Sequence, residues 1–175
     1  MTTPTRPEAW LRGPIPGIDP RLMPAAHALI QAAEDLERAA LGLTPAELWR
    51  TPAGAASVGF HLKHIAGSIT RLLAYARGER LTPEQLQAIA LEREPGDPPS
   101  GAPELVRRAR ESIDRAIDAL RHTDPATLFD ARAIGRQALP TNVLGLLFHL
   151  AEHTQRHTGQ VITTAKIVRG TPAGA

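Results

Sequence analysis

Histidines are concentrated in two short stretches of this chain. Seven occur among 175 residues, and three of them, His149, His153 and His157, follow one another at intervals of four. In a helix this interval places all three imidazoles on one face, each about 6 Å further along the axis. Two imidazoles at positions i and i+4 can chelate one divalent cation when another element supplies a third ligand. The spacing therefore predicts a metal site.

The second stretch contains His61 and His64, within a predicted helix over residues 57–78. At 100° per residue, His61 lies about 60° from the centre of the apolar stripe of this helix, and His64 lies about 120° away. Helical phase alone therefore favours His61 as the third ligand. Ser68 continues the same polar shoulder one turn further on.

On the helix of the first stretch, His153 and His157 lie about 40–80° from the apolar stripe, and His149 lies about 120° away. Gln160 continues this shoulder. Two facing polar shoulders would enclose a cleft between the helices. Glu152 lies on the far side of the helix from the stripe, where an exposed ion pair is the expected role. The alternative for the histidines is that they are exposed or singly hydrogen-bonded and bind no metal.

Four amphipathic segments carry apolar residues at spacings of three and four, which predicts an all-α four-helix bundle. No segment alternates as a strand would. Two short accessory helices are expected after the caps Thr44 and Thr82, each followed by Pro and then Glu or Gln at the third position. The connection between the second and third long helices is long enough for a crossover. The four long segments are residues 20–41, 57–78, 103–122 and 140–168.

The domain boundaries follow from proline and glycine. Five prolines within residues 1–20 make residues 1–19 an irregular leader, and Trp10 and Leu11 are expected to anchor it by packing on the domain. Residues 20–169 are the bundle, and 170–175 are a flexible tail.

Composition limits the chemistry and the partners. Aromatic residues make up only 3% of the chain, so we expect a core of Leu, Ile, Val and Ala. Lys and Arg number 20 against 18 Asp and Glu and are spread along the chain, which argues against nucleic-acid binding. No apolar run approaches the roughly 20 residues of a membrane span, and no secretory signal is recognisable, so a cytoplasmic location is expected. Because cysteine is absent, any thiol must come from a substrate.

The run from His153 to Gln160, His-Thr-Gln-Arg-His-Thr-Gly-Gln, resembles the His-x3-His-x-Gly-Gln signature in the last long helix of the DinB/YfiT-like superfamily. Residues 57–68, Ser-Val-Gly-Phe-His-Leu-Lys-His-Ile-Ala-Gly-Ser, are similar to the second-helix segment of that family. The resemblance covers residues 20–168 and implies that His64, His153 and His157 are the metal ligands. The family motif thus selects His64 as the third ligand, whereas helical phase favours His61. We follow the motif and expect His61 and His149 to lie beside the ligands.

The resemblance also implies a function. Family members are four-helix bundles, commonly dimeric, with a divalent metal held by three histidines, nickel and zinc both being candidates. Characterised relatives transfer or isomerise groups with low-molecular-weight thiols such as bacillithiol, mycothiol or glutathione. We therefore expect a metal-dependent S-transferase, or a hydrolase if water is activated instead. Apart from the resemblance, Arg132 and Arg136 just before the last long helix are candidates for holding an anionic substrate by bidentate contacts, and the alternative is that they are ordinary surface arginines. The alternatives are a non-catalytic or stress-related metal-binding bundle and an interaction module without metal. No catalytic residue beyond the ligands is identified.

Overall fold

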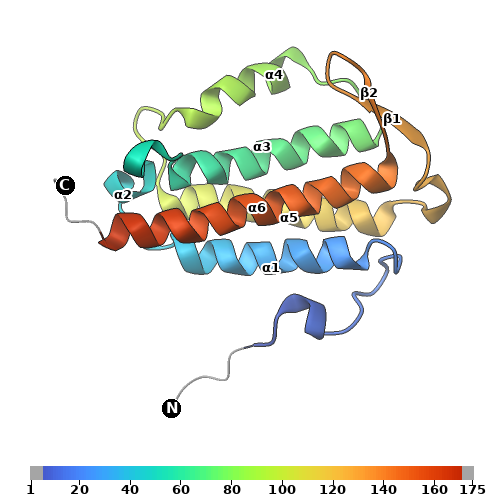
Figure 1. The fold of residues 1–175 in the computed structure, drawn as a ribbon, viewed down its shortest axis with the longest axis horizontal. Coiled ribbons are helices and arrows are strands. Elements are labelled where there is room, and N and C mark those ends of the chain that lie inside the picture. The colour runs from blue at the N-terminus through green and yellow to red at the C-terminus, as the bar shows by residue number, and fades with distance from the viewer. Residues whose placement is uncertain (1–5, 171–175) are drawn as a thin grey trace.

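The computed structural model describes residues 6–170, and four long helices form its main body (Figure 1). Two short helices accompany them, which confirms the predicted all-α bundle with accessory helices. The long helices are α1 (Met23–Ala40), α3 (Val58–Ala76), α5 (Ala102–His122) and α6 (Val143–Gly170), and the short ones are α2 (Pro45–Trp49) and α4 (Pro83–Ala90).

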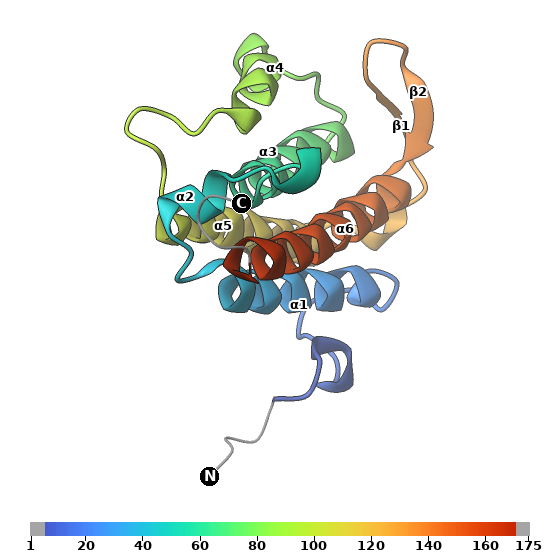
Figure 2. The same cartoon turned by 60° about the vertical axis from the view of Figure 1, so that its left-hand side comes forward.

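The order of the helices around the bundle differs from their order in the chain. Both α1 and α3 pack against α5 and α6, so α1 and α3 lie across the diagonal (Figure 2). Helices α3 and α5 run in the same direction, because the connection between them, which includes α4, returns along the length of the bundle (Figure 1). This is the crossover that the long connection allows. It also leaves α6 antiparallel to α3 and in direct contact with it.

The core is aliphatic, as the composition predicts. The largest fully buried side chains are all Leu or Ile, and each contributes about 1.5–3 kcal/mol on burial. Within the described residues they come from all four long helices and from the segments beside them: Leu22, Leu29, Leu36, Leu48, Leu62, Ile65, Ile69, Leu105, Ile113, Leu120, Leu128 and Leu147.

Side-chain caps mark where α2, α3 and α4 begin. Thr44 and Glu47 form a reciprocal capping box at α2, and Thr82 and Gln85 form another at α4. Ser57 Oγ accepts an amide hydrogen bond in the first turn of α3. Both capping boxes were predicted from the sequence. The cap at Ser57 fixes the first residue of α3, and the burial of Val58, Leu62 and Ile65 sets which way the histidines in its first two turns face.

A small hairpin corrects two predictions. Strands β1 (Ala131–Ile134) and β2 (Leu139–Asn142) pair antiparallel just before α6, where we expected no strand and a helix from Pro140. Gly135, with φ 70°, provides a left-handed residue in the hairpin turn. Asn142 Oδ1 then accepts an amide hydrogen bond from the first turn of α6, so this helix begins at Val143. Four-residue strands are too short to show a period in the sequence.

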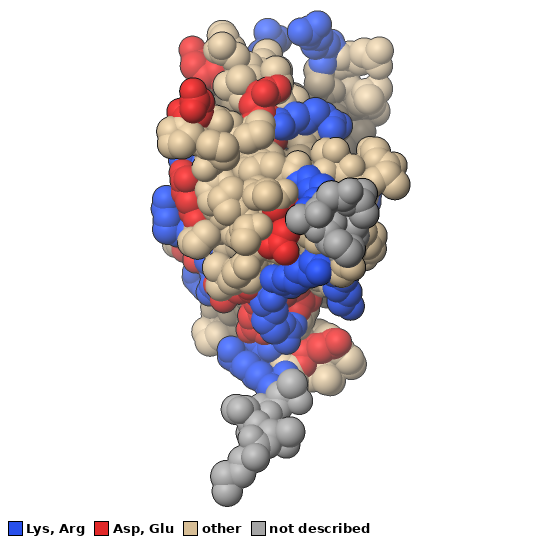
Figure 3. Space-filling view, turned by 90° about the vertical axis from the view of Figure 1, so that its left-hand side faces the viewer, with Lys and Arg blue, Asp and Glu red and all other residues tan. Residues whose placement is uncertain are grey.

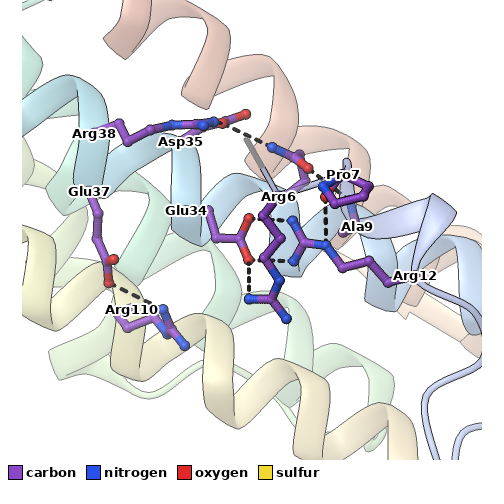
Figure 4. Close-up of polar contacts among 10 residues, drawn as sticks. Arg6, Pro7, Ala9, Arg12, Glu34, Asp35, Glu37, Arg38 and Arg110 are labelled. Carbon is purple, nitrogen blue, oxygen red and sulfur yellow. Dashed lines mark hydrogen bonds and ion pairs between the residues drawn. The ribbon is translucent and has the colours of Figure 1, made fainter. Parts of the chain in front are cut away.

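Residues 6–19 of the leader lie beside α1, on the opposite side of the bundle from α4 (Figures 1 and 2). Arg12 makes two parallel hydrogen bonds of 2.5 and 2.7 Å to the carboxylate of Glu34 on α1 (Figure 4). Trp10 and Leu11 remain 63% and 57% exposed, so the prediction that they anchor the leader is wrong. The bidentate ion pair, the hydrogen bond from the Ala9 amide to Gln31 Oε1 and the burial of Ala9 and Ile18 hold this segment instead. Residues 1–5 of the leader and 171–175 of the predicted tail lie outside the described residues.

Charged side chains of both signs are distributed over the surface. On the end of the bundle drawn in Figure 3, basic and acidic side chains are interspersed. Many of them form ion pairs within one helix, such as Arg107 with Glu111 and Arg110 with Asp114. Among the described residues, no helix combines the length and the hydropathy that a membrane crossing requires.

Candidate metal centre

The contact between α3 and α6 brings His64, His153 and His157 together. Each offers one ring nitrogen, and the three nitrogens lie within 4.8 Å of one another. His64 Nε2 is 2.9 Å from His153 Nε2, and the ring centroids of His64 and His157 are 4.5 Å apart. Within residues 6–170, no other group of three or more histidines or carboxylates meets this criterion.

His61 and His149 extend the cluster at its two sides. His61 is only 5% exposed, and its Nδ1 lies 2.9 Å from Nδ1 of His157. The ring of His149 lies 5.4 Å from that of His153, and its side chain is 47% exposed. The residue favoured by helical phase, His61, and the residue favoured by the family motif, His64, are therefore both in the cluster. His61 is the more buried, as its phase predicts.

Burial keeps three of these imidazoles neutral. It lowers the pKa of His61 and His153 to about 4 and that of His157 to about 3, with a smaller contribution from the neighbouring His64. At neutral pH each of these imidazoles is therefore uncharged, with a proton on one ring nitrogen and a free lone pair on the other. A neutral imidazole with a free lone pair is the form that binds a metal.

Glu92, which was not identified from the sequence, lies in the short 3-10 helix η3 (Leu91–Arg93) after α4. Its side chain enters the bundle beside the cluster and is 5% exposed. Oε2 is 2.7 Å from His64 Nδ1, and Oε1 accepts a hydrogen bond of 2.7 Å from Arg71. Metal-binding histidines usually donate their second ring N–H to such a carboxylate.

The donor set fits a divalent cation. His153 Nδ1 is buried and has no hydrogen-bond partner, while Nε2 of the same ring faces His64 Nε2. A neutral imidazole offers one N–H and one lone pair, so such a group of facing rings leaves ring nitrogens poorly satisfied unless a cation accepts their lone pairs. Three imidazole nitrogens suit zinc, nickel or a similar borderline metal.

The three other residues that we expected near the site do not contact the histidines through any hydrogen bond between described residues. Ser68 is buried one turn beyond His64, and its hydroxyl donates to the carbonyl of Ile65 on its own helix. Gln160 is exposed on α6, three residues after His157. Neither therefore extends the cluster.

Arg136 lies in the hairpin, at the other end of α3. It lines a cavity of about 690 Å³ together with Tyr75, Arg80 and Arg132. Tyr75 follows His64 by eleven residues on α3, which corresponds to about 16 Å along the axis. The arginines thus surround a separate hollow, and none of the histidines lines it.

Comparisons with known proteins agree with this architecture. The family model described as the DinB superfamily matches residues 28–161, which include both histidine stretches. A solved structure of YfiT from Bacillus subtilis, described as a probable metal-dependent hydrolase with an unusual four-helix bundle topology, superposes with a TM-score of 0.65. The match is 13% identical and covers 91% of this chain and 94% of that one, so it shows a shared fold.

No curated protein matches the sequence. The family model nevertheless covers most of the chain, from the second turn of α1 to the middle of α6. The fold has the crossed connection between α3 and α5, and His64, His153 and His157 from the two histidine stretches lie close together. The chain is a member of the DinB superfamily.

Proposed function

We propose that the chain is a metal-dependent enzyme whose divalent cation is held by His64, His153 and His157. The observation that carries this proposal is the convergence of three ring nitrogens within 4.8 Å, from two helices and two distant parts of the sequence. The neutrality of His153 and His157, which follows from their lowered pKa values, supports it. Zinc and nickel are the metals we expect.

Three protein ligands leave coordination positions open for a substrate, which is the pattern of catalytic sites. A cation there would lower the pKa of a thiol or of water and so supply a nucleophile near neutral pH. We propose a low-molecular-weight thiol of the bacillithiol, mycothiol or glutathione type as one substrate, in an S-transferase reaction. The chain has no cysteine of its own, so the sulfur must be brought in.

The protein's side chains have separate roles in this proposal. His153 and His157, one turn apart on α6, fix the position of the centre, and His64 closes it from α3. His149 is half exposed beside His153 and is placed to accept the proton that the nucleophile loses. If the nucleophile is water, the same arrangement gives hydrolysis, the reaction class in the description of YfiT.

Metal content and turnover together test the proposal. Untagged protein should contain one zinc or nickel ion per chain. With a thiol and a chlorodinitrobenzene electrophile it should form the thioether, and His153→Ala should abolish both properties. His122→Ala is the matched control, because His122 is an exposed histidine at the end of α5. Turnover that survives the loss of His64, His153 and His157 would overturn the proposal.

A non-catalytic metal-binding bundle is the second candidate, and His61 is the observation in its favour. Its Nδ1 lies 2.9 Å from His157 Nδ1, so a fourth imidazole is within reach of the cluster. Four protein ligands would close the coordination sphere, as in structural sites. X-ray absorption of the zinc-loaded protein separates the two: three imidazoles plus an oxygen ligand favour the enzyme, and four imidazoles favour the closed site.

We also propose a homodimer, because large apolar side chains are exposed on α6 and on the hairpin. Phe148, Ile167 and Leu139 are among them. Sedimentation velocity should give a mass of two chains, and a single-chain mass at micromolar concentration would contradict this.

A further inference from the structure

A buried carboxylate stands out in a connection that is otherwise exposed. The segment between α3 and α5 carries Leu91 and Arg93 on the surface, but Glu92 between them is buried. Burying a carboxylate costs free energy unless charges and hydrogen bonds compensate for it. The partners of Glu92 therefore indicate why it is inside.

Each oxygen of Glu92 has its own partner. Oε1 accepts from the guanidinium of Arg71 at 2.7 Å, and Oε2 lies 2.7 Å from Nδ1 of His64. The other ring nitrogen of His64, Nε2, lies 2.9 Å from His153 Nε2 and so faces the cluster. Glu92 and the candidate cation thus occupy opposite edges of the same imidazole. The carboxylate acts on the centre through His64.

The structure holds Glu92 in place from several directions. Lys63 donates to the carbonyl oxygens of Leu91 and Glu94 at 2.9 and 2.6 Å, which ties the backbone on both sides of Glu92 to α3. Gly67 leaves the space for its head group. A Cβ at Gly67 would overlap Oε1 of Glu92 and would lie 2.7 Å from a guanidinium nitrogen of Arg71.

We infer that Glu92 is a positioning residue that holds His64 as the Nδ1–H tautomer with Nε2 free for the cation, and that it couples the α3–α5 connection to the metal centre. This inference depends on the proposed function. An anionic acceptor makes the imidazole a better ligand and fixes the orientation of its ring. Because coupling is reciprocal, a cation on His64 also stabilises the packing of the connection against α3.

The first test measures zinc affinity by competition with a chromogenic chelator. Glu92→Gln, which keeps the shape and removes the charge, should weaken binding by about tenfold or more. Gly67→Ala should weaken it in the same direction, because the methyl group displaces the carboxylate while alanine favours the helix. Glu94→Gln is the matched control, an exposed carboxylate two residues away, and should bind within about twofold of the original protein.

Two further readouts separate positioning from a general structural role. The ¹⁵N NMR spectrum of the zinc-loaded original protein should show that His64 carries its proton on Nδ1. This measurement requires no variant. Zinc should slow amide hydrogen exchange over residues 85–94 in the original protein but not in Glu92→Gln. An Nδ1-bound metal with Nε2–H at His64, or unchanged zinc affinity in both Glu92→Gln and Gly67→Ala, would overturn this inference alone. An original protein that binds no zinc would overturn the proposed function instead.

Discussion

The two walls of the histidine cluster are built in different ways. On α6, His153 and His157 come from consecutive turns of one helix, and their second ring nitrogens meet either nothing or the neutral ring of His61. On α3, His64 is the one proposed ligand, and it is backed by a buried carboxylate and an arginine. Helical geometry suffices to place a pair, whereas a single ligand needs a separate element to orient it.

The difference also determines where charge is buried. Glu152 lies next to His153 in the sequence, but its carboxylate pairs with Arg156 at 2.9 Å and with His149 at 3.3 Å rather than with a proposed ligand. The carboxylate that contacts a proposed ligand, His64, comes instead from η3, across the crossover connection. Within residues 6–170, the two ligands on α6 therefore have no carboxylate hydrogen-bonded to them, whereas the ligand on α3 has one.

The largest effect should come from removing a ligand. We expect zinc binding to weaken by ~100-fold or more in each of the variants His64→Ala, His153→Ala and His157→Ala, because each leaves only two of the three proposed ligands. Isothermal titration calorimetry measures this, with His122→Ala as the control. If only the α6 variants lost affinity, the α3 wall would have no part in binding and the comparison would fail.

The second effect is on the stability of the metal-free protein against acid. The pKa values of His61, His153 and His157 are about 4, 4 and 3 in the fold, below the value of 6.5 for a free histidine. Below pH 6.5 the unfolded chain therefore binds more protons than the folded chain does. The contribution of these neutral histidines to the free energy of unfolding is fully present above pH 6.5 and is lost as the pH falls toward 4.

The midpoint of thermal unfolding should accordingly fall by at least ~5 °C between pH 7 and pH 5 in the presence of a chelator. Differential scanning calorimetry provides the measurement. A double variant with His153→Gln and His157→Gln should lose part of this dependence, which tests the neutral α6 wall specifically. A midpoint that is the same at pH 7 and pH 5 in the original protein would contradict the burial of neutral imidazoles.

A smaller effect is expected from His61→Phe, which keeps a buried ring and removes the partner of His157 Nδ1. As a group that orients His157, His61 should contribute about tenfold to zinc affinity, as Glu92 does by orienting His64. Competition with a chelator gives the value. A loss as large as that of His153→Ala would instead make His61 a fourth ligand and favour the non-catalytic bundle.

The smallest effect should come from Glu152→Gln. This carboxylate is partly exposed and is paired with Arg156 on the outside of α6, and a surface ion pair contributes about 0–1 kcal/mol. Zinc affinity should change by less than about twofold. A loss comparable with that of Glu92→Gln would show that both walls use acidic support and would remove the distinction between them.

The sequence predicted what depends on local geometry. The steps of four from His149 to His157 and the cap-Pro-acid patterns at Thr44 and Thr82 are properties of a single helix, and the structure contains them all. The family motif added His64, whose phase on α3 alone favoured its neighbour His61.

The sequence did not predict what depends on packing between distant elements. Glu92 lies in a connection with no periodicity, and only the return of the chain along α3 brings it to His64. The hairpin depends on the turn at Gly135 and on the cap at Asn142, neither of which alters the apolar pattern of α6. Trp10 gave the wrong expectation because the ion pair of Arg12 and Glu34 fixes the leader without it.

The most direct test of the account is a crystal structure of the protein isolated without an affinity tag, with anomalous scattering measured at the absorption edge of the metal found by elemental analysis. The account predicts one anomalous peak per chain at about 2.0–2.2 Å from a ring nitrogen of each of His64, His153 and His157. A metal-soaked crystal with no peak between α3 and α6, or with the peak bound elsewhere, would contradict it.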